Sequence, residues 1–407
     1  MIQYRRFAVL GLVSFGIACA TASVQAAAQK PSAPDDAPAP SYKVDANWHP
    51  QLPVNQLIGD VPSISIDAKN NVWIFQRADT LLNNTRGAIS NPPEAACCKQ
   101  APEIIQMDPN GKVLQAWGGP GWDHWPVAMM EHTPPSGPGA EAAAKKGPPM
   151  THGQEHGLLV DHDGNVWMSG YSIDANNGYI MKFSNKGKFL LQIGSSAGVG
   201  STPLSKLSQD PNIFGWPTRF AEDAKNHLLF VTDGYVNQRV IVFDSNTGKF
   251  VRMWGAYGKK PDGITDMRAK HLDDPNNPRF DTPHGIAISP EGLVYVADRG
   301  NNRIQIFKED GTYVTQWVYD PETKWPGSTW DLAIPETDPD YLVFIDGTNN
   351  KLNVVRRSDG KVVHSYGRTG HYAGEFIYGH AIAIDHQGNV YTGEVAGGQR
   401  VQKWLRQ

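Results

Sequence analysis

The sequence is poor in cysteine: its 407 residues contain only three. So few sulfur atoms cannot hold together a chain of this length, and a large hydrophobic core has to do so instead. One cysteine, Cys19, lies in the N-terminal segment, and the other two are the adjacent Cys97 and Cys98. In an oxidising compartment this adjacent pair could form a strained disulfide or remain as two free thiols.

The sequence also lacks a strong excess of charge. It has 37 Lys and Arg against 41 Asp and Glu, which gives a net charge of −4. Proteins that bind nucleic acid carry a concentrated basic face, so no nucleic-acid partner is expected.

No hydrophobic run is long enough to span a membrane comfortably. The apolar stretch from Phe7 to Ala20 follows Arg5 and Arg6 and precedes a set of small residues. This order predicts a signal peptide over residues 1–28, cleaved near Ala26 or Ala28, and therefore a secreted or periplasmic protein without stable membrane insertion. The proline-rich residues 29–45 are predicted to form a disordered linker, and residues 46–407 to form the folded domain.

Glycine, proline and tryptophan are abundant instead, with 41, 30 and 12 copies. Glycine costs about 1 kcal/mol and proline about 3 kcal/mol inside a helix, so helical bundles and coiled coils are excluded. Six copies of one repeat account for much of this composition. Each has apolar and polar residues alternating at period two, with turns every 8–12 residues, which is typical of antiparallel strands.

The clearest repeat runs from His284 to Trp317, and the others begin near Pro62, His156, Pro217, Trp330 and His380. Four strands in each of six repeats predict an all-β, six-bladed β-propeller. The repeats resemble NHL repeats, with Asp298-Arg-Gly-Asn-Asn-Arg303-Ile-Gln-Ile-Phe307 as the closest match. The last repeat is one strand short, and the segment from Tyr42 to Trp48 could supply that strand and close the ring. Three long connections, at residues 80–102, 118–155 and 256–283, could carry function.

His156, His284 and His380 each begin the first strand of a repeat, and their repeats are the second, fourth and sixth. Alternate blades of a six-fold ring lie about 120° apart, so these three side chains can meet in the channel lined by the innermost strands. Three imidazoles with a fourth position open form a catalytic zinc site. The alternative is that each histidine is structural, because His before Gly is common in such repeats.

Two arginines and a tyrosine lie where second strands end. Arg77 and Arg299 occupy matching repeat positions, and Tyr235 lies one residue beyond the equivalent point. All three should reach the channel mouth near the histidines. A phenol next to a divalent cation loses its proton more easily, and arginines there could bind a carboxylate. Arg239 and Arg303 are predicted to form ion pairs within their blades.

Together these residues resemble the catalytic core of the peptidylglycine alpha-amidating lyase family. The resemblance extends from about Pro62 to Trp404 and includes Ile74-Phe-Gln-Arg77, Asp233-Gly-Tyr235 and Ala297-Asp-Arg299. It implies a lyase that cleaves carbinolamides, which are N–C(OH) compounds of small-molecule or peptide origin, to an amide and an aldehyde such as glyoxylate. It also implies that Zn²⁺ is held by the residues His156, His284 and His380, and that catalysis depends on Tyr235 as general base and on Arg77 and Arg299.

Two features depart from the family. The family's paired cysteines are absent from the matching blades, where Val236 follows Tyr235. The resemblance would place an aspartate ligand of a structural Ca²⁺ after the third histidine, where this chain has Ala381. This change counts against Ca²⁺, although backbone carbonyls could still hold an ion. Two other functions stay open: a calcium-dependent propeller hydrolase of the lactonase type, and a non-catalytic NHL-repeat scaffold for binding. A monomer is expected.

Overall fold

The computed structural model describes residues 38–83, 98–119, 122–125, 153–172, 177–194, 208–262 and 274–407. All of them belong to one unit, Pro38–Gln407. The predicted signal peptide, Cys97 and the central parts of the three long connections lie outside these ranges. The only cysteine within them, Cys98, is disulfide-bonded. None of the helices in the described ranges is long and apolar enough to cross a membrane.

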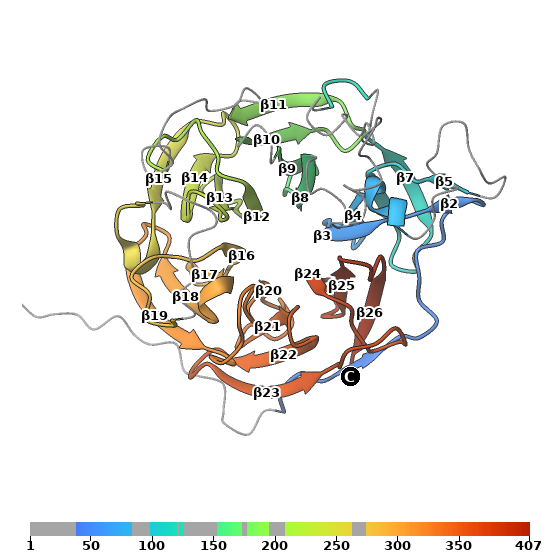
Figure 1. Ribbon diagram of the computed structural model, residues 1–407. Coiled ribbons are helices and arrows are strands. Elements are labelled where there is room, and N and C mark those ends of the chain that lie inside the picture. The colour runs from blue at the N-terminus through green and yellow to red at the C-terminus, as the bar shows by residue number, and fades with distance from the viewer. Residues whose placement is uncertain are drawn as a thin grey trace, which may run out of the picture. The chain divides into compact units, whose positions relative to one another are not determined.

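Six four-stranded antiparallel sheets are arranged around a central axis, which confirms the predicted six-bladed β-propeller (Figure 1). Blade 1 consists of β3 (Asp60–Ile66), β4 (Val72–Arg77), β6 (Ile104–Met107) and β7 (Val113–Trp117). Blade 2 consists of β8 (Gly153–Val160), β9 (Val166–Ser172), β10 (Asn177–Phe183) and β11 (Phe189–Gly194). Blade 3 consists of β12 (Pro217–Asp223), β13 (Leu228–Asp233), β14 (Arg239–Asp244) and β15 (Phe250–Trp254).

Blade 4 consists of β16 (Pro283–Ile288), β17 (Leu293–Asp298), β18 (Arg303–Lys308) and β19 (Tyr313–Val318). Blade 5 consists of β20 (Asp331–Ala333), β21 (Tyr341–Asp346), β22 (Lys351–Arg356) and β23 (Lys361–Tyr366). Blade 6 consists of β24 (Gly379–Ile384), β25 (Val390–Glu394), β26 (Val401–Arg406) and β1 (Tyr42–Val44). A short parallel pair, β2 (Gln56–Leu57) and β5 (Lys99–Gln100), lies outside the six blades.

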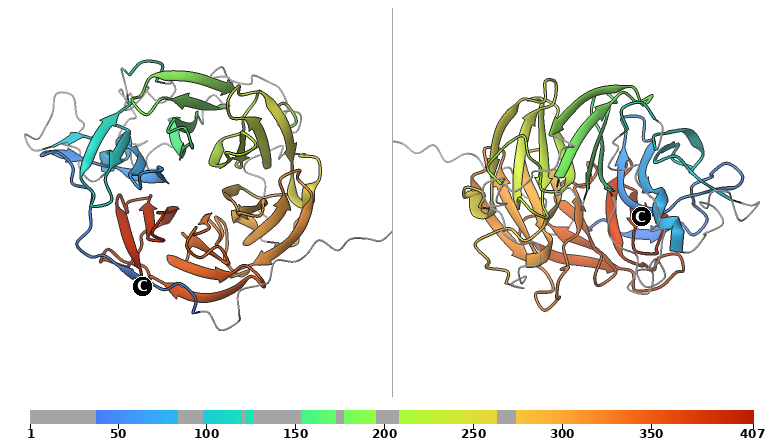
Figure 2. Two further views of the ribbon diagram at one scale, coloured as in Figure 1. Left: turned by 180° about the vertical axis from the view of Figure 1, so that it is seen from behind. Right: turned by 45° about the horizontal axis from the view of Figure 1, so that its top comes forward.

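The N-terminal strand closes the ring. β1 pairs antiparallel with β26, with Tyr42 opposite Arg406 and Val44 opposite Trp404. The two ends of the domain therefore share blade 6 (Figure 2). This closure removes the open sheet edge that the last repeat would otherwise present. Tyr42–Val44, which the sequence analysis placed in the linker over residues 29–45, is a strand of the folded domain.

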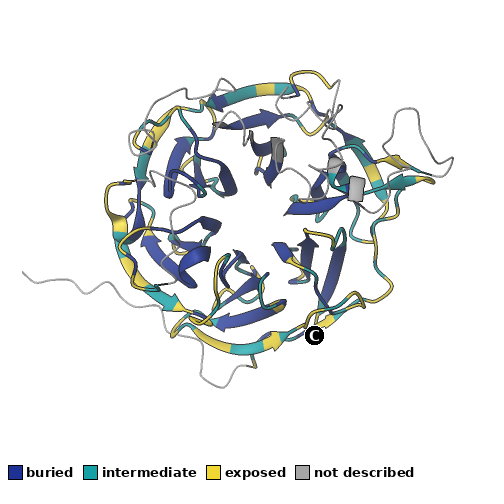
Figure 3. Ribbon diagram, in the orientation of Figure 1, coloured by how far each residue is buried: buried dark blue, intermediate teal, exposed yellow. Residues whose placement is uncertain are grey.

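Hydrophobic side chains fill the space between every pair of neighbouring blades. Six separate clusters of buried apolar residues occupy the six interfaces, and inner strands are almost fully buried while outer strands are partly exposed (Figure 3). A tryptophan at the end of the outer strand often packs on a glycine of the next blade. Trp254, for example, lies against Gly311, which has φ +90°; a Cβ there would approach the indole to 3.0 Å. Packing of this kind explains part of the surplus of tryptophan and glycine.

Candidate metal centre

The first strands of blades 2, 4 and 6 each carry one of the three predicted histidines near their start. In all three sheets the register between the first and second strands shifts at this point, and such a bulge redirects a side chain. The imidazoles face one another across the axis. Their ring centroids are 4.9 Å apart for His156 and His284, 5.0 Å for His156 and His380, and 4.7 Å for His284 and His380.

Each of these imidazoles is anchored to the next blade around the ring. The three Nδ1 atoms lie 3.1, 2.7 and 2.8 Å from the main-chain oxygens of Thr218, Trp330 and Pro62, respectively. A carbonyl oxygen can only accept a hydrogen bond, so each Nδ1 carries the proton. The lone pair of each neutral ring is therefore on Nε2, and the carbonyl fixes both the tautomer and the orientation of the ring.

The protonation state of the cluster suits a cation. Burial lowers the pKa of all three imidazoles well below its ordinary value, and the positive charges of Arg77 beside His156 and of Arg299 beside His284 lower it further. Neutral imidazole is the form that binds metal ions. The ligand atoms of His156, His284 and His380 all lie within 4.8 Å of one another, and Nε2 of His284 is buried without a hydrogen-bond partner. The donor set therefore fits Zn²⁺ with an open coordination position.

Tyr235 lies at the edge of the histidine cluster, just after β13. Its hydroxyl oxygen is 3.2 Å from Nε2 of His156 and 3.5 Å from Nη1 of Arg299. Arg299 begins the short 3₁₀ helix η5 (Arg299–Asn301), and its guanidinium carbon lies 4.3 Å from the ring centroid of Trp330 and 5.3 Å from that of Tyr235. The phenol is thus placed between an imidazole and a fixed positive charge.

Arg77, the last residue of β4, is buried on the other side of the cluster. Its Nε donates a 2.8 Å hydrogen bond to the main-chain oxygen of Glu155, the residue before His156. Its two terminal nitrogens donate no hydrogen bond to any residue in the described part of the chain. The Nε of Arg299 is likewise buried without a partner. Both arginines therefore keep N–H groups that could donate hydrogen bonds to a carboxylate.

Tyr171 at the end of β9 is a further aromatic residue of this site that the sequence analysis did not identify. Its ring stacks on Trp216, with centroids 4.7 Å apart, and lies 5.8 Å from that of Tyr235. Burial, and then the neighbouring Tyr235, raise the pKa of the Tyr171 hydroxyl. By strand register Tyr171 occupies in blade 2 the position that Arg77 and Arg299 occupy in blades 1 and 4, so alignment of the repeats would have revealed it.

Buried ion pairs hold the loops that carry Tyr235 and Arg299. Arg239 pairs with Asp233 at 3.0 Å, and Arg303 pairs with Asp298 at 2.7 Å, with all four side chains fully buried. These contacts confirm the ion pairs predicted for Arg239 and Arg303. Each aspartate also accepts a main-chain N–H from the segment leading into its blade. The pairs therefore fix both loops next to the first strands that carry the histidines.

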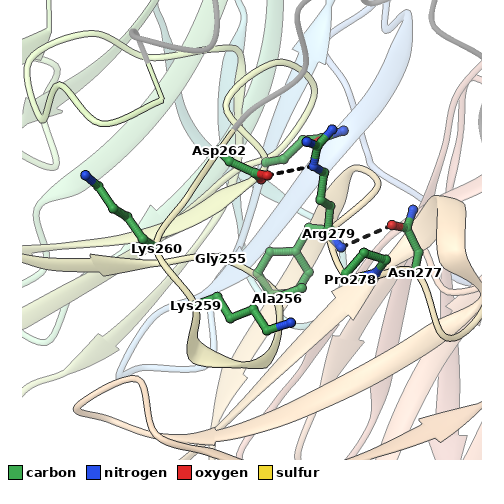
Figure 4. Close-up of a pocket in the computed structure, with 10 residues that line it drawn as sticks. Gly255, Ala256, Lys259, Lys260, Asp262, Asn277, Pro278 and Arg279 are labelled. Carbon is green, nitrogen blue, oxygen red and sulfur yellow. Dashed lines mark hydrogen bonds and ion pairs between the residues drawn. The ribbon is translucent and has the colours of Figure 1, made fainter.

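A pocket of about 380 Å³ lies away from this cluster, beside the 3₁₀ helix η4 (Ala256–Gly258). Figure 4 shows Lys259, Lys260 and an ion pair between Asp262 and Arg279 at its rim, with a nitrogen–oxygen distance of 2.7 Å. None of the predicted site residues lines it. The predicted site residues therefore lie at the histidine cluster and not in this pocket.

Comparison with known proteins finds similarity to NHL-repeat proteins and to enzymes of peptide amidation. Residues 280–307 match the NHL repeat family. Peptidyl-glycine alpha-amidating monooxygenase of Mus musculus is 28% identical over 260 residues, which cover 62% of this chain and 21% of that protein. Peptidyl-alpha-hydroxyglycine alpha-amidating lyase 1 of Drosophila melanogaster is 27% identical over 272 residues, which cover 65% of this chain and 40% of that protein. The chain is therefore similar, at low identity, to proteins named for alpha-amidating activity, and the matched region spans less than half the length of either of them. The predicted family resemblance is thereby confirmed.

The amidating-lyase-like propeller also resembles proteins of other descriptions. NHL repeat-containing protein 3 of Homo sapiens is 23% identical over 378 residues, which cover 89% of this chain and 84% of that protein. A solved structure of a Bacteroides thetaiotaomicron protein of unknown function matches with a TM-score of 0.51 and 13% identity, covering 90% of this chain and 76% of that one. This structural likeness supports the propeller fold and nothing further.

Proposed function

We propose that this protein is an exported carbon–nitrogen lyase that cleaves carbinolamides to an amide and an aldehyde such as glyoxylate. The observation that carries the proposal is the convergence of three buried, neutral imidazoles next to Tyr235 and two arginines with unused donors. The relatives named as alpha-amidating lyases support the same chemistry. Since the alignments cover only part of those relatives, the substrate is inferred from the site.

Zinc is the proposed cofactor. His156, His284 and His380 would hold Zn²⁺, which when bound supplies Lewis-acid polarisation of the carbinol oxygen. The carbonyl partners of the three Nδ1 atoms keep the rings oriented for this purpose.

Tyr235 is the proposed base. Its oxygen takes the proton of the substrate hydroxyl, the carbon–oxygen bond becomes a carbonyl, and the carbon–nitrogen bond breaks with its electron pair moving to nitrogen. The phenol that results holds the proton needed by the leaving amide nitrogen, so the reaction balances without a further reactant. The guanidinium of Arg299, 3.5 Å from this oxygen, stabilises the negative charge of the phenolate.

Arg77 and Arg299 are the proposed carboxylate-binding residues. A substrate of the α-hydroxyglycine type carries a carboxylate on the carbinol carbon, and that carboxylate remains on the glyoxylate product. The free terminal nitrogens of Arg77 and the unpaired Nε of Arg299 are suitable donors. This arrangement favours substrates with an anionic group next to the reacting carbon.

The direct test is turnover of N-benzoyl-α-hydroxyglycine by the purified chain. Equal amounts of benzamide and glyoxylate, released faster than in buffer alone, are the expected result. Release no faster than in a sample of the same protein with His284→Ala would contradict the proposal. That variant controls for contaminating activity because it differs only in the metal cluster.

A non-catalytic binding propeller is the second candidate, because the match to NHL repeat-containing protein 3 extends over more of both chains than the lyase matches do. On this account the face of the propeller would bind a protein or glycan, and the substitution Tyr235→Phe would leave function intact. The histidine cluster, which a scaffold would not need, favours the lyase. The lactonase type is disfavoured by the same cluster, because such sites centre calcium on carboxylate and amide oxygens.

A further inference from the structure

A second layer of side chains lies one residue further along each first strand, next to the histidine layer. On blades 2, 4 and 6 the residue after the histidine is small. On blades 1, 3 and 5 the corresponding residue is polar: Ser63, Arg219 and Asp331. These three polar residues come from blades that are not neighbours, yet their side chains meet across the axis.

Arg219 is the centre of this layer. Its Nε and Nη2 lie 2.8 Å and 2.7 Å from Oδ2 of Asp331, its Nη1 donates to Oγ of Ser63, and its Nη2 lies 3.4 Å from the main-chain oxygen of His380. Asp331 Oδ2 also accepts the main-chain N–H of Ile382 at 3.0 Å. One buried ion pair therefore joins blades 1, 3, 5 and 6, and it contacts the strand that carries the third histidine on both sides of Ala381.

The small residues on the histidine blades leave room for this ion pair. A Cβ on Gly285 would lie 2.7 Å from Cα and 2.9 Å from Oδ1 of Asp331. Ala381 is fully buried and offers no oxygen ligand from its side chain. Small residues on the histidine blades thus accompany one large cation and one carboxylate on the other blades.

We propose that the guanidinium of Arg219 serves as a built-in cation at the centre of the channel, paired with Asp331, and makes a structural calcium ion unnecessary in this protein. The residues do not fit calcium: the expected carboxylate ligand is absent at Ala381, and a guanidinium already lies against the His380 carbonyl, where it would repel a divalent cation. By holding the backbone on either side of Ala381, the pair also acts as a positioning device for His380. This last point rests on the proposed zinc function, whereas the calcium point does not.

The calcium point is tested on the wild-type chain by thermal unfolding. The protein is passed over a chelating resin, resupplied with zinc sulfate, and unfolded with and without excess calcium chloride. The expected shift in unfolding midpoint is less than about 1 °C, because a ligand stabilises only a state that binds it. A rise of several degrees with calcium would overturn the inference, whatever the protein's activity.

The ion pair is tested with Arg219→Met, Asp331→Asn and the double variant, with Arg406→Met as the matched control. Arg406 pairs with Asp338 at 2.6 Å on the partly exposed outer side of blade 6. Each single channel variant should unfold about 5–10 °C below the control, because it leaves one buried charge unpaired, and the double variant should recover part of that loss. Singles as stable as the control, or a double no better than the worse single, would contradict the pairing.

The positioning role is tested by zinc affinity, measured by competition with a chelating dye on variants that are folded by circular dichroism. Arg219→Met should weaken zinc binding about 10- to 100-fold, while Arg219→Lys, which keeps the charge, should retain most of it. Wild-type zinc affinity in a folded but less stable Arg219→Met protein would show a purely structural ion pair. Absence of zinc binding by the wild-type chain would instead count against the proposed function and leave the calcium result standing.

Discussion

Two sets of blades use the same strand positions for different purposes. In blades 2, 4 and 6 the first strand supplies a histidine followed by a small residue. In blades 1, 3 and 5 a main-chain carbonyl near the start of the first strand accepts a hydrogen bond from a histidine of the preceding blade. The residue after that carbonyl is polar and belongs to the group formed by Ser63, Arg219 and Asp331. The difference shows that the three histidines and the carbonyls that orient them come from alternate blades, so the six-fold repeat is divided into two three-fold sets.

The largest expected effect comes from breaking the histidine set. His284→Ala removes one of three ligands and should abolish zinc binding and lower glyoxylate release to the rate of buffer, since a site with two imidazoles holds zinc poorly. Metal analysis and the turnover assay are both applied to the variant. His386→Ala is the control, because His386 is exposed in a turn and pairs with Glu336. If the His284→Ala variant retained both zinc and turnover, the three histidines would not form the zinc site.

A smaller effect is expected from Tyr235→Phe, which keeps the ring and removes only the hydroxyl. The turnover number should fall about 10²- to 10⁴-fold while one zinc per chain is retained, because a general base contributes a factor of that size. Tyr372→Phe is the control, since Tyr372 is 80% exposed. If the turnover number stays at the wild-type value, the general base is a group other than Tyr235.

A still smaller effect is expected from Arg77→Met. Loss of a charge-assisted hydrogen bond to the substrate carboxylate should raise KM or lower kcat/KM roughly 10- to 100-fold. The same variant assayed on the corresponding carboxamide substrate should show little change, because that substrate has no carboxylate to lose. Arg368→Met, at an 80% exposed side chain, is the control. Equal losses on both substrates would assign Arg77 to support of the fold.

The smallest effect concerns the stability of blade 5 and leaves the site unchanged. Among the described residues, the buried Asp346 of this blade has no arginine partner of the kind that pairs with Asp233 in blade 3 and Asp298 in blade 4. Burial raises the pKa of Asp346 to about 7, and Lys351 offers little compensation. The native state therefore holds a proton that the unfolded state has lost, so this group's contribution to stability falls as pH rises from about 4 to 7. Asp346→Asn should remove that fall, with kinetic constants unchanged.

Asp338→Asn is the matched control for the pH series. The hydrogen bond from Arg406 lowers the pKa of Asp338, so its contribution to stability is present above the ordinary aspartate pKa and is lost as pH falls below it. Chemical denaturation at a series of pH values should therefore show opposite slopes for the two variants relative to wild type. Slopes of the same sign would contradict the assigned pKa directions.

Much of the fold could be predicted because it is periodic. Alternation at period two and the recurrence of one unit predicted six blades, and the missing strand of the last unit pointed to the segment beginning at Tyr42. The meeting of His156, His284 and His380 followed from the same six-fold count. These are properties of the repeat, so they are visible in one sequence.

The ion pair between Arg219 and Asp331 was not predicted, although both residues and Ser63 occupy matching repeat positions, because three different residue types at those positions form no recognisable ligand set. Arg219 follows Thr218 in a strand, where an alternating polar residue is ordinary, and only the three-dimensional register places it across the axis from Asp331. Tyr171 occupies the repeat position of Arg77 and Arg299 but is a different residue type, so residue identity alone does not mark it. The connections at residues 80–102, 118–155 and 256–283 lie largely outside the described ranges, and their roles stay predictions.

The most direct test of the central claim is the metal content of the purified wild-type chain, measured together with glyoxylate release before chelation, after chelation and after return of each metal alone. The account predicts about one zinc per chain, loss of release when zinc is removed, and recovery with zinc but not with calcium. A chain that contains no zinc, or one that releases glyoxylate equally well without it, would contradict the account.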